Sequence, residues 1–229
     1  MIYIKRIHMV TALLLILGIL LLVIALTERS QMVNQSMITS GNTVVIDAGH
    51  GGKDAGTIGV DGTEEKGINL QMAQKLYDFL TCSGIRCSLI RDGDYEYYPT
   101  NSDRSRSDLY NRLDYVNSVD SAVLISVHQN HYDNESEWGT QIWYSANDEQ
   151  SKVLADNVLC TVKEFLQPGN TRENKASDDS YYLLYRAKVP SIMVECGFMS
   201  NQRENELLQD SQYQADFAYC ILLGICEEV

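Results

Sequence analysis

The hydrophobic pattern of this chain alternates between helical periods and short apolar runs. Apolar residues recur at helical spacing over Glu65–Cys82, Asp103–Asn117, Gln150–Leu166 and Tyr213–Cys226. Short runs typical of strands lie at Val44–Ile46, Arg86–Ile90, Ala122–Val127, Gly139–Tyr144, Tyr182–Tyr185 and Ser191–Val194. This alternation predicts an α/β domain with a mostly parallel, twisted sheet and helices on both faces. Asn201 and Glu204 have the spacing of a capping pair at the start of one further short helix.

The first part of the chain has a different pattern. Met9–Leu26 contains no charged residue and consists mostly of Leu, Ile and Val, and Lys5 and Arg6 precede it. At about 1.5 Å per residue, a helix of this length would span the hydrocarbon core of a bilayer. We therefore expect residues 1–29 to form an uncleaved membrane anchor that leaves the rest of the chain outside the cytoplasm. A cleaved signal segment, which would make the protein secreted, is the alternative.

Residues 30–42 are polar and typical of a linker, and residues 43–229 have the length of a single domain. The whole chain carries a net charge of −13 at pH 7. Because affinity for nucleic acid comes largely from basic contacts to phosphate, this acidic chain is a poor candidate for binding nucleic acid. The cysteines include no CxxC pair, which disfavours a structural zinc site made of thiolates.

Two histidines follow apolar strands at the point where each strand is expected to end. His50 follows the run that ends at Ile46, through a glycine-rich loop, and His128 directly follows Val127. His8 belongs to the flank of the expected anchor. Ligands of open α/β sheets bind at the carboxyl edge of the strands, so His50 and His128 are candidates for a site at that edge.

Carboxylates accompany these histidines. Glu64 and Glu65 open the first expected helix, and Glu195 directly follows the apolar run that ends at Val194. Two imidazoles and one carboxylate can form a three-ligand zinc site with a coordination position left for water. A second carboxylate could then move protons during metal-assisted hydrolysis.

From the residues alone, other interpretations stay open. His128 could be a strand-end residue bonded to a backbone carbonyl, and His131 could replace it as a ligand, although the polar neighbours of His131 predict that it faces solvent. Glu195 lies between apolar segments, and a carboxylate in such a position is usually buried and paired. A thiol hydrolase based on Cys196 would need a histidine oriented beside the thiol, whereas a metal accounts better for both histidines.

Four ordered motifs give the chain a family resemblance: VVIDAGHGGKDAGTIG, EKGINL, LISVHQN and PSIMVECGFMSN. Together they resemble the zinc-dependent N-acetylmuramoyl-L-alanine amidases of the Amidase_3 family, over nearly all of residues 43–229. The resemblance implies an α/β sheet with helices on both faces. It also implies hydrolysis, in peptidoglycan, of the amide between the lactyl group of N-acetylmuramic acid and the first L-alanine of the stem peptide.

The resemblance implies a role for each matching residue. His50, Glu65 and His128 would hold a zinc ion. Glu195 would take the proton of the attacking water and pass it to the departing alanine amine. The neighbouring Glu64 permits a one-residue slip in the choice of the second ligand.

Asn130 and Arg112 are candidate substrate-binding residues at the rim of the site, and a surface or helix-stabilising role is the alternative for Arg112. The chain departs from the usual family pattern in small ways. Ala48 stands where proline is common, and Gln129 and His131 stand where small residues are common. None of these changes removes a ligand.

A short, membrane-anchored amidase without a wall-binding module resembles the sporulation amidases of the CwlD type, which help to form muramic-δ-lactam in spore cortex. Lytic amidases of cell separation share the same catalytic motifs. The expected partners are therefore peptidoglycan and the membrane, and the sequence identifies no activating protein. The rival interpretations are an extracytoplasmic zinc peptidase acting on stem peptides and a wall-binding protein without catalysis. The presence of all four catalytic positions argues against a protein without catalysis.

Overall fold

The computed structural model describes residues 17–18, 41–99 and 107–226. The chain divides into two units, Met37–Glu227 and Met1–Ser36 with Glu228–Val229. Of the smaller unit, the described residues Leu17 and Gly18 are helical and exposed. Almost all of the expected anchor and linker thus lies outside the described residues. Within the described ranges, no helix is both long and apolar enough to cross a membrane.

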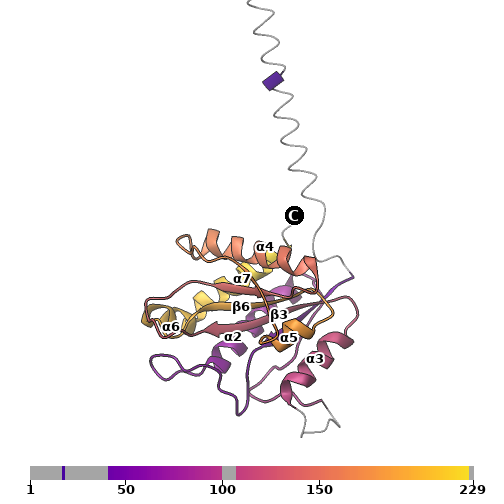
Figure 1. The fold of residues 1–229 in the computed structure, drawn as a ribbon, viewed down its shortest axis with the longest axis horizontal. Helices are drawn as coiled ribbons and strands as arrows, with labels where there is room; N and C mark the ends of the chain where they lie inside the picture. Colours follow the sequence, from indigo (N-terminus) through magenta and orange to yellow (C-terminus); the bar gives the residue numbers. More distant parts are fainter. Residues whose placement is uncertain (1–16, 19–40, 100–106, 227–229) are drawn as a thin grey trace, which may run out of the picture. The chain divides into compact units, whose positions relative to one another are not determined.

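Six strands of the larger unit form one sheet in the order β2-β1-β3-β6-β4-β5, and the central strands are seen in Figure 1. The strands are β1 (Thr43–Ala48), β2 (Cys87–Leu89), β3 (Ala122–Asn130), β4 (Gln141–Tyr144), β5 (Lys175–Ala176) and β6 (Ser191–Phe198). The short edge strand β5 has no counterpart in the sequence prediction. The other five strands overlap the predicted runs.

The sheet is mixed, whereas the sequence predicted a mostly parallel one. The pairings β1–β2, β1–β3, β3–β6 and β4–β5 are parallel, but β4 runs antiparallel to β6. The connection after β3 explains the difference. A parallel return needs a crossover of a dozen or more residues, usually a helix. Residues 131–140 contain no helix, and they bring the chain back beside β6 in the opposite direction.

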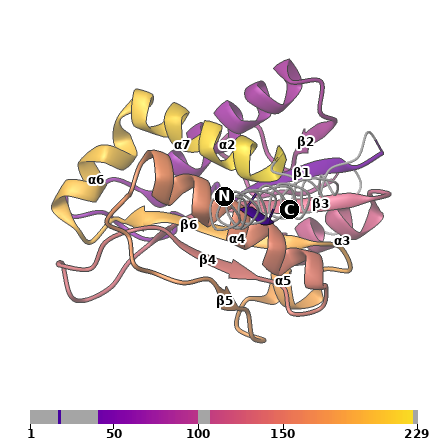
Figure 2. The same cartoon turned by 90° about the horizontal axis from the view of Figure 1, so that it is seen from above.

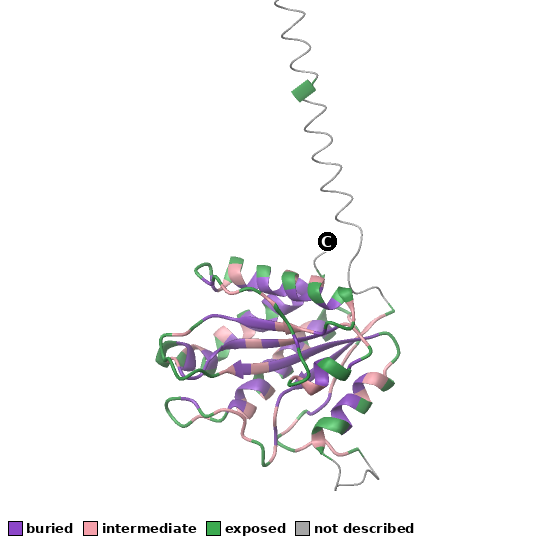
Figure 3. Ribbon diagram, viewed as in Figure 1, coloured by how far each residue is buried: buried purple, intermediate pink, exposed green. Residues whose placement is uncertain are grey.

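Helices cover both faces of the sheet, as predicted. Their bounds are α2 (Glu65–Cys82), α3 (Asp108–Ser118), α4 (Glu149–Phe165), α5 (Tyr182–Arg186), α6 (Gln202–Gln209) and α7 (Ser211–Cys226). One hydrophobic core joins Val44 and Ile46 to α2, α4 and α7, and the other joins Val45 to α3 and α5. Figure 2 shows α7 next to α2, and Figure 3 shows burial concentrated in the strands and in the inward sides of the helices.

One predicted strand is a helix. Tyr182–Tyr185 lies within α5, where the consecutive residues Leu183 and Leu184 are both buried in the same core. A strand would point consecutive side chains to opposite faces, so the helical turn buries this pair better.

The predicted cap of α6 is half confirmed. The Asn201 side chain accepts a hydrogen bond from the backbone N–H of Glu204. The Glu204 carboxylate does not close the capping box, because it accepts from the backbone N–H groups of Gly139 and Phe198.

The carboxyl ends of β1, β3 and β6 share one edge of the sheet, because these strands are adjacent and parallel. His128 on β3 is the direct register partner of Glu195 on β6. Both side chains line a cavity on the face that α3 and α5 cover. This edge therefore carries two of the predicted site residues side by side.

Candidate metal centre

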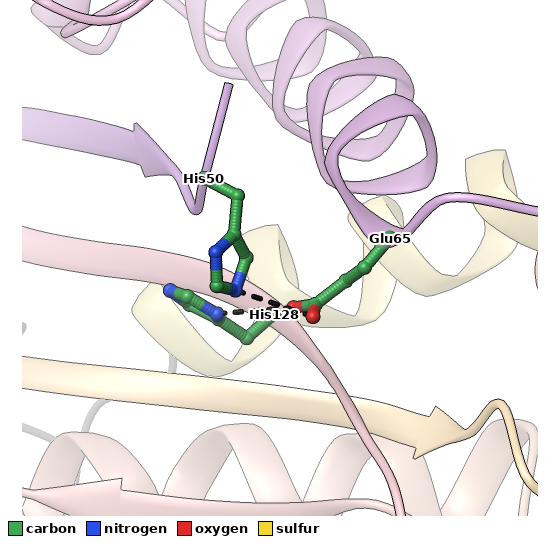
Figure 4. A group of neighbouring side chains, drawn as sticks. All are labelled: His50, Glu65 and His128. Carbon is green, nitrogen blue, oxygen red and sulfur yellow. Dashed lines mark hydrogen bonds and ion pairs between the residues drawn. The ribbon is translucent and has the colours of Figure 1, made fainter. Parts of the chain in front are cut away.

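Three side chains from separate segments converge at this edge (Figure 4). His50 Nε2 lies 3.2 Å from Glu65 Oε2, and His128 Nδ1 lies 3.1 Å from Glu65 Oε1. One possible ligand atom of each residue lies within 4.8 Å of the others. The two imidazole rings meet edge to face with their centroids 4.9 Å apart. The structure thus brings together the three residues that the sequence proposed as metal ligands.

The loop after β1 places His50 against His128. His50 has a φ of 62°, a left-handed backbone conformation that residues other than glycine rarely adopt. Gly49 leaves the space that the neighbouring ring needs, since a Cβ at this position would lie 2.2 Å from the His128 imidazole. The Gly-His pair therefore lets ligands from adjacent strands approach each other closely.

The structure places Glu65, and not Glu64, in the cluster. Glu65 is the first residue of α2, and its side chain is 3% exposed. The side chain of Glu64 is 50% exposed and pairs with Lys66 at 3.1 Å. The one-residue ambiguity in the sequence is therefore removed by geometry.

The charge of Glu65 is balanced within the cluster. Among the described residues, the two imidazoles are its ion-pair partners. Burial would raise the pKa of the Glu65 carboxyl, but His128 and His50 outweigh this effect and lower it. Burial lowers the pKa of both imidazoles, but Glu65 and Asp54 together raise the pKa of His50 to about 9, and Glu65 also raises that of His128. A metal ion would take the place of the imidazole protons.

Other groups orient the proposed ligands. Asp54 Oδ2 lies 2.7 Å from His50 Nδ1, which leaves the Nε2 of that ring directed at Glu65. The Asn69 side chain donates to Glu65 Oε1 at 3.0 Å. The backbone N–H of Thr57 donates to Glu65 Oε2 at 2.8 Å. His50 and Glu65, the two proposed ligands outside the strands, are thus both oriented by hydrogen bonds with neighbouring residues.

The donor set fits zinc. Zinc binds imidazole nitrogens and carboxylate oxygens, and catalytic zinc sites typically have three protein ligands. His50, Glu65 and His128 supply two imidazoles and a buried carboxylate, and among the described residues no Lys or Arg forms an ion pair with that carboxylate. Such a set can hold a divalent cation.

Glu195 stands beside the cluster with one oxygen free. Its Oε2 is buried and has no hydrogen-bond partner among the described residues. Burial raises the pKa of the Glu195 carboxyl to about 7, although the charge of His128 acts in the opposite direction. A carboxyl with a pKa near neutrality and an unused oxygen is suited to general acid–base chemistry.

A cavity of about 670 Å³ lies over these residues. This volume lies within the range of small-molecule sites. Tyr181 stacks on Trp143, with ring centroids 4.4 Å apart, and this contact holds one part of the wall in place. Besides Tyr181, the wall includes the aromatic and apolar side chains Tyr98, Leu109, Tyr182 and Leu183.

Arg112 lines the cavity, but its donors are used within the protein. Its guanidinium pairs with Asp47 at 2.6 Å and with Asp108 at 2.8 Å. It also donates to the carbonyls of Ala48 and His50, at 2.8 and 2.6 Å. Only 3% of the Arg112 side chain is exposed. The geometry therefore favours a role in holding the His50 loop over the substrate contact that the sequence suggested.

The structure also places the other sequence candidates. Asn130 lies outside the set of described residues that line the cavity, and its Oδ1 accepts from the backbone N–H of His131. His131 is exposed, as predicted, and lies outside the cluster. Cys196 is fully buried, and burial raises the pKa of its thiol well above the usual value. A thiolate nucleophile is therefore disfavoured.

Sequence reasoning missed the residues that support the ligands. Arg91 is 1% exposed and donates to the carbonyls of Ala48 and Gly49, at 2.8 and 2.9 Å. An arginine directly after an apolar strand was the only available signal for it. Asn69 follows Glu65 by four residues on α2, and this helical spacing could have revealed the pair.

The chain is similar to known proteins over most of its length. The family model described as Amidase_3, N-acetylmuramoyl-L-alanine amidase, matches residues 44–227. The germination-specific N-acetylmuramoyl-L-alanine amidase of Bacillus subtilis (strain 168) is 28% identical over 194 residues, which cover 83% of this chain and 81% of that protein.

Solved structures share the fold. The CwlD amidase from Clostridioides difficile, in complex with the GerS lipoprotein, matches with a TM-score of 0.74 and 34% identity. The match covers 80% of this chain and 95% of that one. The N-acetylmuramoyl-L-alanine amidase AmiC2 of Nostoc punctiforme matches with a TM-score of 0.69 and 29% identity, over 80% of this chain and 94% of the other.

Proposed function

The chain belongs to the Amidase_3 family of N-acetylmuramoyl-L-alanine amidases, and from this premise we propose that it is a zinc hydrolase of peptidoglycan. The bond it cuts is the amide between the lactyl group of N-acetylmuramic acid and L-alanine. The observation that carries this proposal is the cluster of His50, Glu65 and His128, with the free carboxylate oxygen of Glu195 in the same cavity.

The three proposed ligands and Glu195 have different tasks in this reaction. When held by His50, Glu65 and His128, a zinc ion would supply Lewis acidity that polarises the scissile carbonyl and acidifies a water. Glu195 accepts the proton of the attacking water at Oε2. It then gives that proton to the alanine nitrogen as the carbon–nitrogen bond breaks. Burial raises the pKa of this carboxyl, and the positive charge of a bound zinc ion would act in the opposite direction and favour the carboxylate that accepts the proton.

The cavity determines where the substrate lies. Its lining includes His50, His128 and Glu195 together with Tyr181 and Tyr182. Aromatic side chains with hydroxyl groups offer both apolar faces and hydrogen bonds to a sugar or peptide. We therefore assign substrate contact to the tyrosine wall in place of Asn130 and Arg112.

Digestion of purified peptidoglycan tests the function. The expected products are stem peptides with a free L-alanine amine and glycan strands with an intact lactyl carboxylate, both identified by mass spectrometry. A chelator should abolish the activity, and added zinc should restore it. Glu195→Gln is the catalytic control, since it keeps the size of the side chain but removes the base.

New amine ends within the stem peptide would instead identify a peptidase. Binding to peptidoglycan without any new ends, in protein loaded with zinc, would support the wall-binding alternative. Cleavage that persists in Glu195→Gln would refute the proton-transfer role assigned to that residue.

We also propose a location. The uncharged run Met9–Leu26, preceded by Lys5 and Arg6, supports membrane anchoring with the catalytic domain outside the cytoplasm. Cell fractionation should recover the full-length chain in the membrane. Protease added to spheroplasts should degrade the catalytic domain. A mature chain that lacks residues 1–29 and appears in the medium would favour secretion instead.

The likeness to a germination-specific amidase and to CwlD supports a role in spore cortex. We propose that the chain helps to form muramic-δ-lactam there. Expression in a Bacillus subtilis strain without its germination-specific amidase should restore the lactam in cortex muropeptides. Failure of an active, well-expressed protein to do so would favour a role in wall remodelling. Because the CwlD structure contains the GerS lipoprotein, crosslinking in sporulating cells would reveal whether this chain also has a protein partner.

A further inference from the structure

A buried glutamine lies behind the proposed metal centre. Gln129 follows His128 on β3, and 4% of Gln129 is exposed. Successive side chains of a strand point to opposite faces, so Gln129 points to the α2 side of the sheet while His128 lines the cavity. Its Nε2 donates to Asn69 Oδ1 at 3.0 Å. Gln129 thus contacts a residue that itself contacts Glu65.

The acceptor groups that Asn69 contacts determine the direction of these hydrogen bonds. Asn69 Nδ2 faces Glu65 Oε1 at 3.0 Å and the carbonyl of Gly49 at 3.2 Å, and both of these groups can only accept. Asn69 must therefore present its N–H groups to them and its oxygen to Gln129. Gln129 must in turn present its own N–H group. The order of donors runs from Gln129 through Asn69 to Glu65.

The amide of Gln129 is incompletely satisfied. Its Oε1 is buried without a hydrogen-bond partner among the described residues. Its Nε2 also lies 3.5 Å from the Met72 sulfur, and the side chain contacts the buried Cys196 thiol, so much of the site is apolar. An unpaired buried oxygen is unfavourable for stability, and an apolar side chain of similar size would avoid it. The benefit of a glutamine here lies in the hydrogen bond that it donates to Asn69.

We propose that Gln129 is a positioning residue for the metal centre, which acts through Asn69 to orient the Glu65 carboxylate. Because the Asn69 side-chain oxygen accepts a hydrogen bond from Gln129, the Asn69 amide cannot rotate away from Glu65. Glu65 Oε1 then keeps a fixed side-chain donor, in addition to the backbone N–H of Gln129 at 2.9 Å. Partners of this outer kind orient ligands and raise metal affinity. The inference rests on the zinc site proposed above.

Zinc affinity of the purified full chain tests this proposal, measured by competition with a chromophoric chelator. Gln129→Met should weaken zinc binding by about 10-fold, at the lower end of the range for outer partners of metal ligands. The urea midpoint of the zinc-free protein should change little, because the substitution also removes the unpaired oxygen. Gln129→Leu serves as a second variant should the methionine variant fold poorly.

Gln214→Met is the matched control. Gln214 is also a buried glutamine with an unpartnered Oε1, and its Nε2 donates to the carbonyl of Leu208 at 2.8 Å and to Gln71 Oε1 at 3.0 Å, away from the cluster. This variant should bind zinc as tightly as the unaltered chain. A general loosening of the fold would weaken zinc binding in both variants, which would overturn a specific role for Gln129.

The double variant Asn69→Ala/Gln129→Met tests whether Gln129 acts on Glu65 through Asn69. If Gln129 acts through Asn69, zinc affinity in the double variant should equal that of Asn69→Ala alone. A further 10-fold loss in the double variant, or unchanged affinity in Gln129→Met, would overturn the proposal. A failure of the unaltered chain to bind zinc would instead refute the metal site itself, so the two failures are distinguishable.

Discussion

The buried ion pair between Arg112 and Asp47 gives a direct test of how the His50 loop is held. Each side chain of the pair is 3% exposed, and Arg112 Nη1 lies 2.6 Å from Asp47 Oδ1. The same guanidinium donates to the carbonyls of Ala48 and His50. Arg112→Met keeps an unbranched side chain at this position but removes every one of these donors.

The expected loss of stability follows from what remains behind. In Arg112→Met, the Asp47 carboxylate keeps the Ser126 hydroxyl, which donates to it at 2.7 Å, but loses its buried counter-charge. Breaking a buried ion pair by removing one partner costs about 3–5 kcal/mol. We expect a loss of this size in the free energy of unfolding, measured by urea denaturation of the full chain.

A second substitution separates the charge from the other contacts. Asp47→Asn combined with Arg112→Met leaves a neutral amide in place of the uncompensated carboxylate. The double variant should therefore be more stable than Arg112→Met alone. A loss below about 1 kcal/mol in Arg112→Met, typical of an exposed pair, would refute the reasoning. So would a double variant whose loss equals the sum of the two single losses.

The same pair predicts a dependence on pH. Burial raises the pKa of the Asp47 carboxyl, but Arg112 and the other partners outweigh burial and hold it below 3.8. In the unfolded chain an aspartate titrates at about 3.9, so protons bind there more readily than in the folded state. The stability from this group is thus complete above that pH and is lost as the pH falls through the lower folded pKa. The stability difference between the unaltered chain and Asp47→Asn should shrink between neutral pH and about pH 3.

Three further predictions concern the site. Glu195→Gln should lower kcat by about 10²–10⁴-fold while zinc content, measured by elemental analysis, stays unchanged, and a loss of zinc would contradict its assignment as a base outside the ligand set. Gly49→Ala should reduce zinc content, because the added methyl group would lie 2.2 Å from the His128 ring, whereas His131→Ala should leave zinc content unchanged. Tyr181→Ala should raise KM for peptidoglycan more than Tyr181→Phe does, because the phenylalanine keeps the ring that lines the cavity; equal effects would assign substrate binding to the hydroxyl alone.

The sequence predicted those site residues that directly follow apolar runs. His128 and Glu195 directly follow the apolar runs Ala122–Val127 and Ser191–Val194 of β3 and β6, so the pattern of buried residues located both toward the same edge of the sheet. The pattern could not show the residues that support the site, because they are distant in the chain. Arg91, for example, donates a hydrogen bond to the Gly49 carbonyl from 42 positions away. For the fold, the sequence predicted the layers, which are a sheet with helices on both of its faces. The reversal of β4 escaped prediction because a connecting loop determines it, and apolar runs carry no information about strand direction.

The supports follow a physical division between the ligands. His128 and Glu195 belong to neighbouring strands, so the hydrogen-bond ladder already fixes their backbones relative to each other. His50 lies in a loop with an unfavourable φ, and Glu65 is the first residue of a helix, where the backbone N–H group has no intrahelical partner. The polar supports accordingly converge on these two residues: Arg91, Arg112 and Asp54 on the His50 loop, and Asn69 and Gln129 on Glu65. Substitutions among the supports should therefore reduce metal affinity through His50 or Glu65 while the paired strands keep His128 and Glu195 in register.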